Sequence, residues 1–220
     1  MDRPPRLAPL SGLVFVLLFG VGSAIWGFEQ PSRGAGSEEI VSFYEETSTE
    51  ILIGGTMSIV SVPFLVWFAA VLREHLVAVE GSERSGLPLL AFAGAVLVAA
   101  VGLGAETINM AGALSADDGQ LTGEAAQIYF DVSYALGAPA AGVGFAMMAV
   151  PTAAIALRTG RLLPPGLAWA ALLVGLAGLT PAMLTSAYQL LYLLVLLSVA
   201  ALSVRLYRND RDVDAAVRRE

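Results

Sequence analysis

The sequence predicts an all-α integral membrane protein, a polytopic bundle of six transmembrane helices with a short extracellular amphipathic helix. Of the 220 residues, 56% are hydrophobic and the mean hydropathy is +0.72, above the roughly 45–50% apolar content of soluble domains. Six apolar stretches are each long enough to cross a bilayer core of about 30 Å. The 12 basic residues are all arginines, and all but Arg33 fall on one side of this pattern.

The six spans form a single transmembrane domain over residues 1–220, because the connections between them are short. Basic residues near the ends of spans stay in the cytoplasm. The arginine pattern therefore predicts a multi-pass protein of the cell (plasma) membrane with both the N- and C-termini cytoplasmic. The predicted spans are 7–28, 51–72, 87–110, 129–157, 166–183 and 187–206, and residues 207–220 form a cytoplasmic tail.

The first span, 7–28, places Trp26 at the outer interface, where amphipathic aromatic residues collect. A cleaved signal peptide is the alternative, since the small residues at 22–24 are of the kind found at cleavage sites. The apolar run is long for a signal peptide, and its glycines suit close helix packing. A retained span is the preferred interpretation.

The loop after the first span carries the predicted extracellular helix. Ser37 is a suitable N-cap, and the two glutamates that follow it are favoured by the helix dipole. Ile40 and Tyr44 recur at helical spacing, which predicts a surface helix over 38–47 with these side chains toward the bundle. Its simplest role is a lid on the outer end of the bundle, and the alternative is a gate for a partner or ligand.

Prolines mark the second and fourth spans. Pro63 lies at the centre of the second span, and Pro139 and Pro151 lie within the fourth. Proline is tolerated in membrane helices where neighbouring helices satisfy the freed carbonyl groups. These positions permit a kink in the fourth span. A tight cytoplasmic turn at 158–165 then leads into the last two spans.

Residue types that the chain lacks exclude much chemistry. Without cysteine there is no disulfide, thiolate nucleophile or iron–sulfur cluster. Without lysine there is no Schiff base and no P-loop lysine. His75 is the single histidine, so a polyhistidine metal site cannot form within one chain. We expect no cofactor, no bound metal and no nucleic-acid partner.

Two stretches resemble a known family. They are the turn LRTGRLLP at 157–164 with Leu167-Ala168-Trp169 after it, and the acidic outer segment with Phe43-Tyr44 that leads into Trp67-Phe68. Both are similar to uncharacterised six-span bacterial integral membrane proteins, a family of the actinobacterial type that carries a domain of unknown function. The resemblance covers most of the chain. It implies the six-span fold and brings no activity or catalytic residue.

Two acidic residues fall within the spans, and intramembrane ionisable residues are candidates for function. Glu106 lies in the last outer turn of the third span and Asp131 near the outer start of the fourth, with Asn109 and Tyr134 at similar depth. Each acid continues a stripe of small residues, which mark helix–helix contact in bilayers. The stripes are Ala95, Ala99 and Gly102 on the third span and Ala135, Ala138 and Gly142 on the fourth.

We therefore expect the third and fourth spans to pack along these stripes and to bring the two carboxyl groups together as a ligand or ion site. Two carboxylates that close cannot both stay ionised unless a proton, a cation or a donor lies between them. The structural alternative is that the helix dipole stabilises Asp131 and that Glu106 is hydrated near the interface. A kink at Pro139 would rotate Asp131 away from the third span.

Three functions are compatible with these features. The preferred hypothesis is a non-enzymatic membrane protein that acts through a membrane protein partner or as a homo-oligomer in the lipid bilayer. The alternative is a small transporter or proton- or cation-coupled carrier that uses the outer carboxylate pair. An aspartyl intramembrane enzyme would need the same pair. A water-filled cavity reaching past the middle of the membrane would favour transport, and a solid core would favour the first hypothesis.

Overall fold

The computed structural model describes residues 7–27, 29–81, 86–180 and 188–217, and the elements in these ranges are all helical. The chain begins with a short 3₁₀ turn, Ala8–Leu10, that leads into the first helix. The helices are α1 (Ser11–Gly27), α2 (Ser37–Glu80), α3 (Leu87–Asp117), α4 (Gly123–Ala135), α5 (Ala141–Thr159), α6 (Pro165–Ala177) and α7 (Tyr188–Val217). A π-helical turn, Leu136–Ala140, joins α4 to α5 so that the two form one rod.

Within the described ranges, five helices are long and apolar enough to cross a membrane. These are α1 with its 3₁₀ turn, α2, α3, the α4–α5 rod and α7. Helix α6 has 13 residues, about 20 Å at 1.5 Å per residue, which is shorter than a bilayer core. The predicted fifth span, 166–183, ends outside the described residues. An all-helical bundle with several helices that could cross a membrane is confirmed, and the count of six spans stays a prediction.

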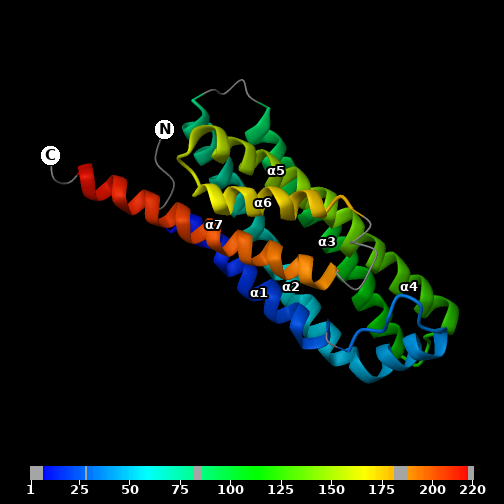
Figure 1. The fold of residues 1–220 in the computed structure, drawn as a ribbon. Helices are drawn as coiled ribbons and strands as arrows, with labels where there is room; N and C mark the ends of the chain where they lie inside the picture. Colours follow the sequence, from blue (N-terminus) through cyan, green and yellow to red (C-terminus); the bar gives the residue numbers. More distant parts are fainter. Residues whose placement is uncertain (1–6, 28, 82–85, 181–187, 218–220) are drawn as a thin grey trace.

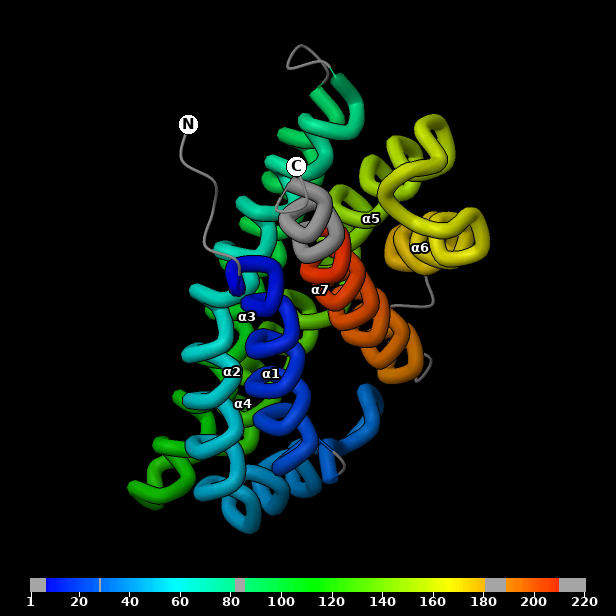
Figure 2. The backbone as a smooth tube through the Cα atoms, turned by 90° about the vertical axis from the view of Figure 1, so that its left-hand side faces the viewer, coloured from blue at the N-terminus to red at the C-terminus, as the bar shows by residue number. Residues whose placement is uncertain are grey.

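The bundle is elongated (Figure 1), and its two ends carry different charged residues. The first turns of α2 and the α3–α4 loop lie at one end, which we call the acidic end because it carries the glutamates of 38–50 together with Asp117 and Asp118. The α5–α6 turn and the start of α1 lie at the opposite end (Figure 2). We call this the arginine end, because Arg73, Arg158 and Arg161 lie there.

Helices α2, α3 and α5 form the centre of the bundle. Helix α1 packs along α2, and the α4–α5 rod packs along α3. Helix α6 packs mainly on α5, while α7 packs mainly on α1 and its 3₁₀ turn. The buried core runs through this centre from Leu65 to Leu76 of α2, and the apolar side chains of the other helices surround it.

Glycines allow the central helices to approach closely. A Cβ atom added to Gly22 of α1 would lie 2.5 Å from the backbone oxygen of Gly54 in α2, and one added to Gly94 of α3 would lie 2.6 Å from that of Gly144 in α5. Neither distance leaves space for a side chain. Small residues are the usual means of helix packing in bilayers, where the hydrophobic effect does not drive helices together.

The segment that the sequence predicts as a surface helix is the first part of α2. The backbone of Thr47 departs from helical geometry, with φ −119° and ψ 17°, and its hydroxyl donates to the carbonyl of Phe43. Such bonds to the preceding turn bend helices. Figure 1 shows the part before this kink lying across the acidic end of the bundle.

The side chains that this segment turns toward the bundle are those predicted, but the residue at its N-cap position is not the predicted one. Ile40 and Tyr44 are fully buried. Gly36, not Ser37, occupies the N-cap position, and no side chain caps the helix there. The carbonyl of Gly36 accepts the first helical hydrogen bond from the amide of Ile40, so the helix begins one residue earlier than expected. The extracellular position of the segment stays a prediction.

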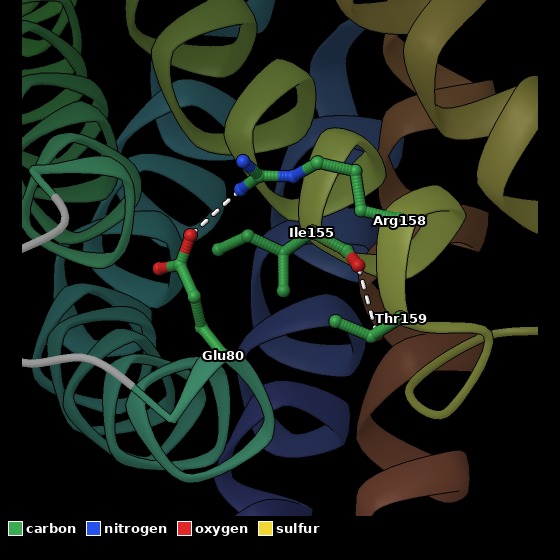
Figure 3. Close-up of polar contacts among 4 residues, drawn as sticks. All are labelled: Glu80, Ile155, Arg158 and Thr159. Atoms are coloured by element: carbon green, nitrogen blue, oxygen red, sulfur yellow. Dashed lines mark hydrogen bonds and ion pairs between the residues drawn. The ribbon is translucent and has the colours of Figure 1, made fainter.

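At the arginine end an ion pair joins α2 to α5 (Figure 3). The Arg158 guanidinium donates to Glu80 Oε1 at 2.6 Å. One residue later, the Thr159 hydroxyl donates to the carbonyl of Ile155. Gly160 then ends α5 with a φ of 65°, the left-handed conformation that glycine adopts at helix ends without steric cost.

Candidate functional site

Glu106 is a buried acidic residue of α3, with 9% of its surface exposed. Helix α3 continues to Asp117, so roughly 16 Å of helix lies beyond Glu106 on the acidic side at 1.5 Å per residue. The helix therefore extends beyond the predicted span 87–110, and the place of Glu106 in the last outer turn of that span stays a prediction. Apolar periodicity ends near Met110, but the helix extends further because the first part of α2 packs on it and buries Gly112 and Ala113.

The carboxyl group of Glu106 faces α2. A Cβ atom added to Gly55 would lie 3.4 Å from Glu106 Oε2, and Ser58, one turn further along α2, places its hydroxyl beside the same carboxyl group. Ser58 is 1% exposed. The small side of α2 therefore provides the space in which the carboxyl group lies.

Several polar atoms in this region have no hydrogen-bond partner. Among the described residues, Glu106 Oε2, Ser58 Oγ and Asn109 Nδ2 are buried and form no hydrogen bond of good geometry, although the Ser58 hydroxyl lies beside the Glu106 carboxyl group. The same holds for the indole nitrogen of Trp26, which lies against Gly54. Buried polar atoms are normally paired, because leaving one unpaired costs about 1–3 kcal/mol. Four such atoms on three adjacent helices indicate that the junction of α1, α2 and α3 is polar and unsatisfied.

A small cavity adjoins this junction. It has about 20 Å³ open to the centre of a water molecule, which is room for about one water. Glu106, Ser58 and Gly102 line one part of it, and aliphatic side chains such as Val62 and Leu65 line the rest together with an aromatic cluster. The aromatic cluster consists of Phe15, Phe19, Phe145 and Tyr192, which stack or meet edge to face.

Asn109, one helical turn from Glu106, is held by α2. The Tyr44 hydroxyl donates to Asn109 Oδ1 at 3.0 Å, and both side chains are buried. The Tyr44 ring lies against Gly112, where an added Cβ would be 2.7 Å from it. The first part of α2 thus covers the acidic side of the Glu106 region and fixes the orientation of the Asn109 amide.

Asp131 does not join Glu106. Its side chain is exposed on α4 and accepts a hydrogen bond from Gln127 Nε2, one turn earlier, at 3.1 Å. The face of α4 that packs inward instead carries Ala126, Phe130 and Ser133. The predicted carboxylate pair is therefore wrong.

The π-helical turn at Leu136–Ala140 gives the physical reason. A π turn contains an additional residue relative to an α turn, so the faces of α4 and α5 are offset from the continuous α-helical register that the prediction assumed. Pro139 lies within this turn and has no amide hydrogen to donate. Tyr192 of α7 donates to the carbonyl of Gly137 at 3.3 Å, which stabilises the irregular backbone.

Tyr134 is also separate from Glu106. It is half-buried on α4, and the guanidinium carbon of Arg33 lies 5.4 Å from the centre of its ring. This is a cation–π contact that connects the loop before α2 to α4. Of the four predicted site residues, the structure keeps Glu106 and Asn109 in one buried region and places Asp131 and Tyr134 outside it.

The third and fourth predicted spans do pack against each other, but at a different level than expected. Their closest approach is at Gly94 and Gly144. Gly102 has no atom within 4 Å of an added Cβ and faces the cavity. Gly142 belongs to a different contact, since its carbonyl lies against Gly178 after α6. Next to Glu106 the two spans still touch, since a Cβ atom added to Gly137 would lie 3.7 Å from the Cβ atom of Ala105. The cavity lies on the side of α3 that Gly102 and Glu106 share.

A second hollow lies between α5, α6 and α7. It has about 70 Å³ open to the centre of a water molecule and is open at the surface. Figures 1 and 2 show α6 and α7 running in different directions, which leaves this groove between them. We call it the α6–α7 groove. Seven small or hydroxyl-bearing residues line it: Ala149, Thr152, Ala170, Ala171, Gly175, Ser198 and Ala201.

Sequence reasoning missed Ser58 and the α6–α7 groove. On α2 the small residues Gly54, Gly55, Ser58 and Ser61 recur at helical spacing. This pattern predicts a close helix contact that includes Ser58. The groove depends on the direction of α6 relative to α7, which has no signature in the sequence.

The part of the chain that the structure describes contains no group of three or more histidine, cysteine, aspartate or glutamate side chains that could hold a metal ion. Comparison with protein families, curated proteins and solved structures finds no match to this chain. The resemblance to the actinobacterial family therefore stays a prediction, and arguments about function depend on the geometry.

Proposed function

We propose that this chain is a non-enzymatic integral membrane protein that acts by assembling with a further transmembrane helix, from a second copy or from another membrane protein. The observation that carries the proposal is the α6–α7 groove. Its lining combines seven small or hydroxyl-bearing residues with larger apolar side chains such as Leu167, Val195 and Leu202. The small residues allow helices to approach closely in a bilayer. Ala170 and Ala201 are exposed in it.

The rest of the bundle supports assembly over transport. The cavity beside Glu106 has room for about one water. On the side of the cavity toward the arginine end, large apolar side chains fill the core, among them Leu65, Phe68 and Leu72, which are almost fully buried. The carboxylate pair on which a carrier mechanism would depend is absent, because Asp131 is exposed. A water-filled path toward the arginine end therefore has no support.

We place the protein in the cell membrane with six spans and both termini in the cytoplasm, because Arg33 is the single arginine at the acidic end and basic residues remain cytoplasmic. Reporter fusions at Glu220 and within 32–46 test this orientation. The expected result is an internal reporter at Glu220 and an external one in the loop. An external reporter at Glu220 would contradict it.

Photo-crosslinking from within the groove tests the assembly. A photoreactive amino acid replaces Ala201 in the groove or, as a control, the exposed Ala100 on α3. We expect a protein adduct of discrete mass from position 201 and not from position 100. Ala170→Leu, which fills the groove, should abolish that adduct. Adducts with lipid alone from position 201 would contradict the proposal.

A further inference from the structure

Burying the carboxyl group of Glu106 is energetically unfavourable, and assembly at the α6–α7 groove does not offset this cost. An isolated ionised carboxylate is costly to bury unless it is paired or hydrogen-bonded. Glu106 is about nine-tenths buried, and its Oε2 atom has no hydrogen-bond partner among the described residues. A group that neutralises its charge or satisfies its oxygen would remove this cost.

None of the neighbouring helices supplies a charged partner. Helix α1 contributes Phe15 and Phe19 to the cavity, α2 contributes Ser58 and apolar side chains, and α5 contributes Phe145. The other titratable group that lines it is Tyr192 of α7, whose hydroxyl donates to Gly137. Beyond the cavity, Tyr44 donates to Asn109. The described residues that line the cavity therefore supply no charged partner for Glu106.

The acidic end favours the approach of cations. The first part of α2 and the α3–α4 loop carry many acidic side chains, and Arg33 is the single basic residue near them. Clustered charge of one sign raises the local concentration of counter-ions. The acidic residues at this end that are exposed are Glu29, Glu38, Glu39, Glu45, Glu46, Glu50, Asp117, Asp118 and Glu124.

We propose that Glu106 and Ser58 form a binding site for one small monovalent cation, a proton or a sodium ion, that enters from the acidic end. The two side chains provide an unpaired carboxyl oxygen and an unpaired hydroxyl oxygen next to a one-water cavity. A single carboxylate matches one positive charge. Calcium takes six to eight oxygen ligands, usually several of them carboxylates, which this site does not provide.

Dicyclohexylcarbodiimide is a suitable probe, because it dissolves in lipid and modifies carboxyl groups in their protonated form. The carboxyl proton passes to a carbodiimide nitrogen, and the carboxyl oxygen bonds to the central carbon. The resulting O-acylisourea rearranges to an N-acylurea that keeps all atoms of both reactants. The full chain in liposomes is treated, and peptide mass mapping locates the modification.

We expect labelling of Glu106 in the wild type and its loss in Glu106→Gln. Asp131→Asn, which removes an exposed carboxyl group of α4, is the matched control and should leave Glu106 labelling unchanged. Above the titration midpoint, the rate should fall about tenfold per pH unit. Protection by sodium chloride but not by choline chloride identifies sodium as the ligand, and the absence of such protection identifies the proton.

Thermal unfolding in detergent provides a second readout that needs no access by the reagent. The difference in Tm between the wild type and Glu106→Gln should change with pH, with sodium or with both, because only the wild type gains or loses the bound cation. The corresponding difference for Asp131→Asn should stay constant. Equal pH and sodium dependence of the wild type and Glu106→Gln would overturn the proposal, whatever the labelling result.

Discussion

The small residues of the central helices and those of the α6–α7 region differ in what they contact. Where α1 meets α2 and α3 meets α5, glycines bring backbone against backbone, and no space remains for a methyl group. Between α6 and α7, Ala170 and Ala201 are exposed in an open groove, whereas Gly175 packs against Ala149 of α5. The same residue types therefore close one interface and leave another available.

Small residues therefore indicate where helices can make contact, but they do not by themselves identify the partner helix. At Gly94 the partner is within the chain. At Ala170 and Ala201 no helix of the described chain fills the groove. Substitutions in the two regions should therefore affect different properties, stability in the centre and association at the groove.

Gly94→Ala should have the largest effect on stability. The new methyl group would lie 2.6 Å from backbone atoms of Gly144 and Met148, so α3 and α5 must separate. We expect a loss of about 3 kcal/mol, in the range of severe overpacking. The control is Gly20→Ala on α1, where the nearest side chain is 3.9 Å away and the change should stay within about 0.5 kcal/mol. Equal effects in reversible unfolding would contradict the close contact.

Tyr44→Phe should have an intermediate effect. It removes the hydroxyl that donates to Asn109 and leaves the buried Asn109 carbonyl unpaired, at a cost of about 1–2 kcal/mol. A double-mutant cycle with Asn109→Leu isolates the bond. In that background the Tyr44→Phe substitution should cost much less, because the acceptor is already gone. The same cost in both backgrounds would show that the hydrogen bond does not stabilise the fold.

Arg158→Ala should have a small effect. The pair with Glu80 is short, and 57% of the Arg158 side chain but only 12% of the Glu80 side chain is exposed. Because water reaches the guanidinium, we expect a loss of about 1 kcal/mol, at the upper end of the range for exposed ion pairs. The contribution should shrink at high salt because exposed charges are screened. Arg161→Ala in the neighbouring exposed turn is the control. A salt-independent loss above about 2 kcal/mol would show a stronger role for this contact than its exposure indicates.

Hydropathy predicts the helical bundle well, because long apolar stretches must form helices in a bilayer. It predicts helix ends poorly. The apolar pattern of α3 ends near Met110, yet the helix continues to Asp117 because Tyr44 and Gly112 pack together. The inward face of Glu106 follows from its small neighbours along the helix, and its burial agrees with that prediction.

The absence of the carboxylate pair could not be predicted from the sequence, because the position of Asp131 depends on one irregular turn. A continuous α-helix through Pro139 would have placed Asp131 in line with Ala138 and Gly142, whereas the π turn at Leu136–Ala140 changes the register between them. Proline indicates that a helix can deviate there, but not in which way. Ser58 was missed for a different reason, since its role depends on the space that Gly55 leaves on α2.

The proposed function requires that the α6–α7 groove binds another transmembrane helix. The most direct measurement is the mass of the particle extracted from its native membrane in polymer-bounded lipid discs, where the wild type is compared with Ala170→Leu plus Ala201→Leu and with the control Ala100→Leu. We predict a complex larger than the single 22.9 kDa chain for the wild type and the control, and a single folded chain for the groove variant. A single chain in all three, or an unchanged complex in the groove variant, would contradict the claim.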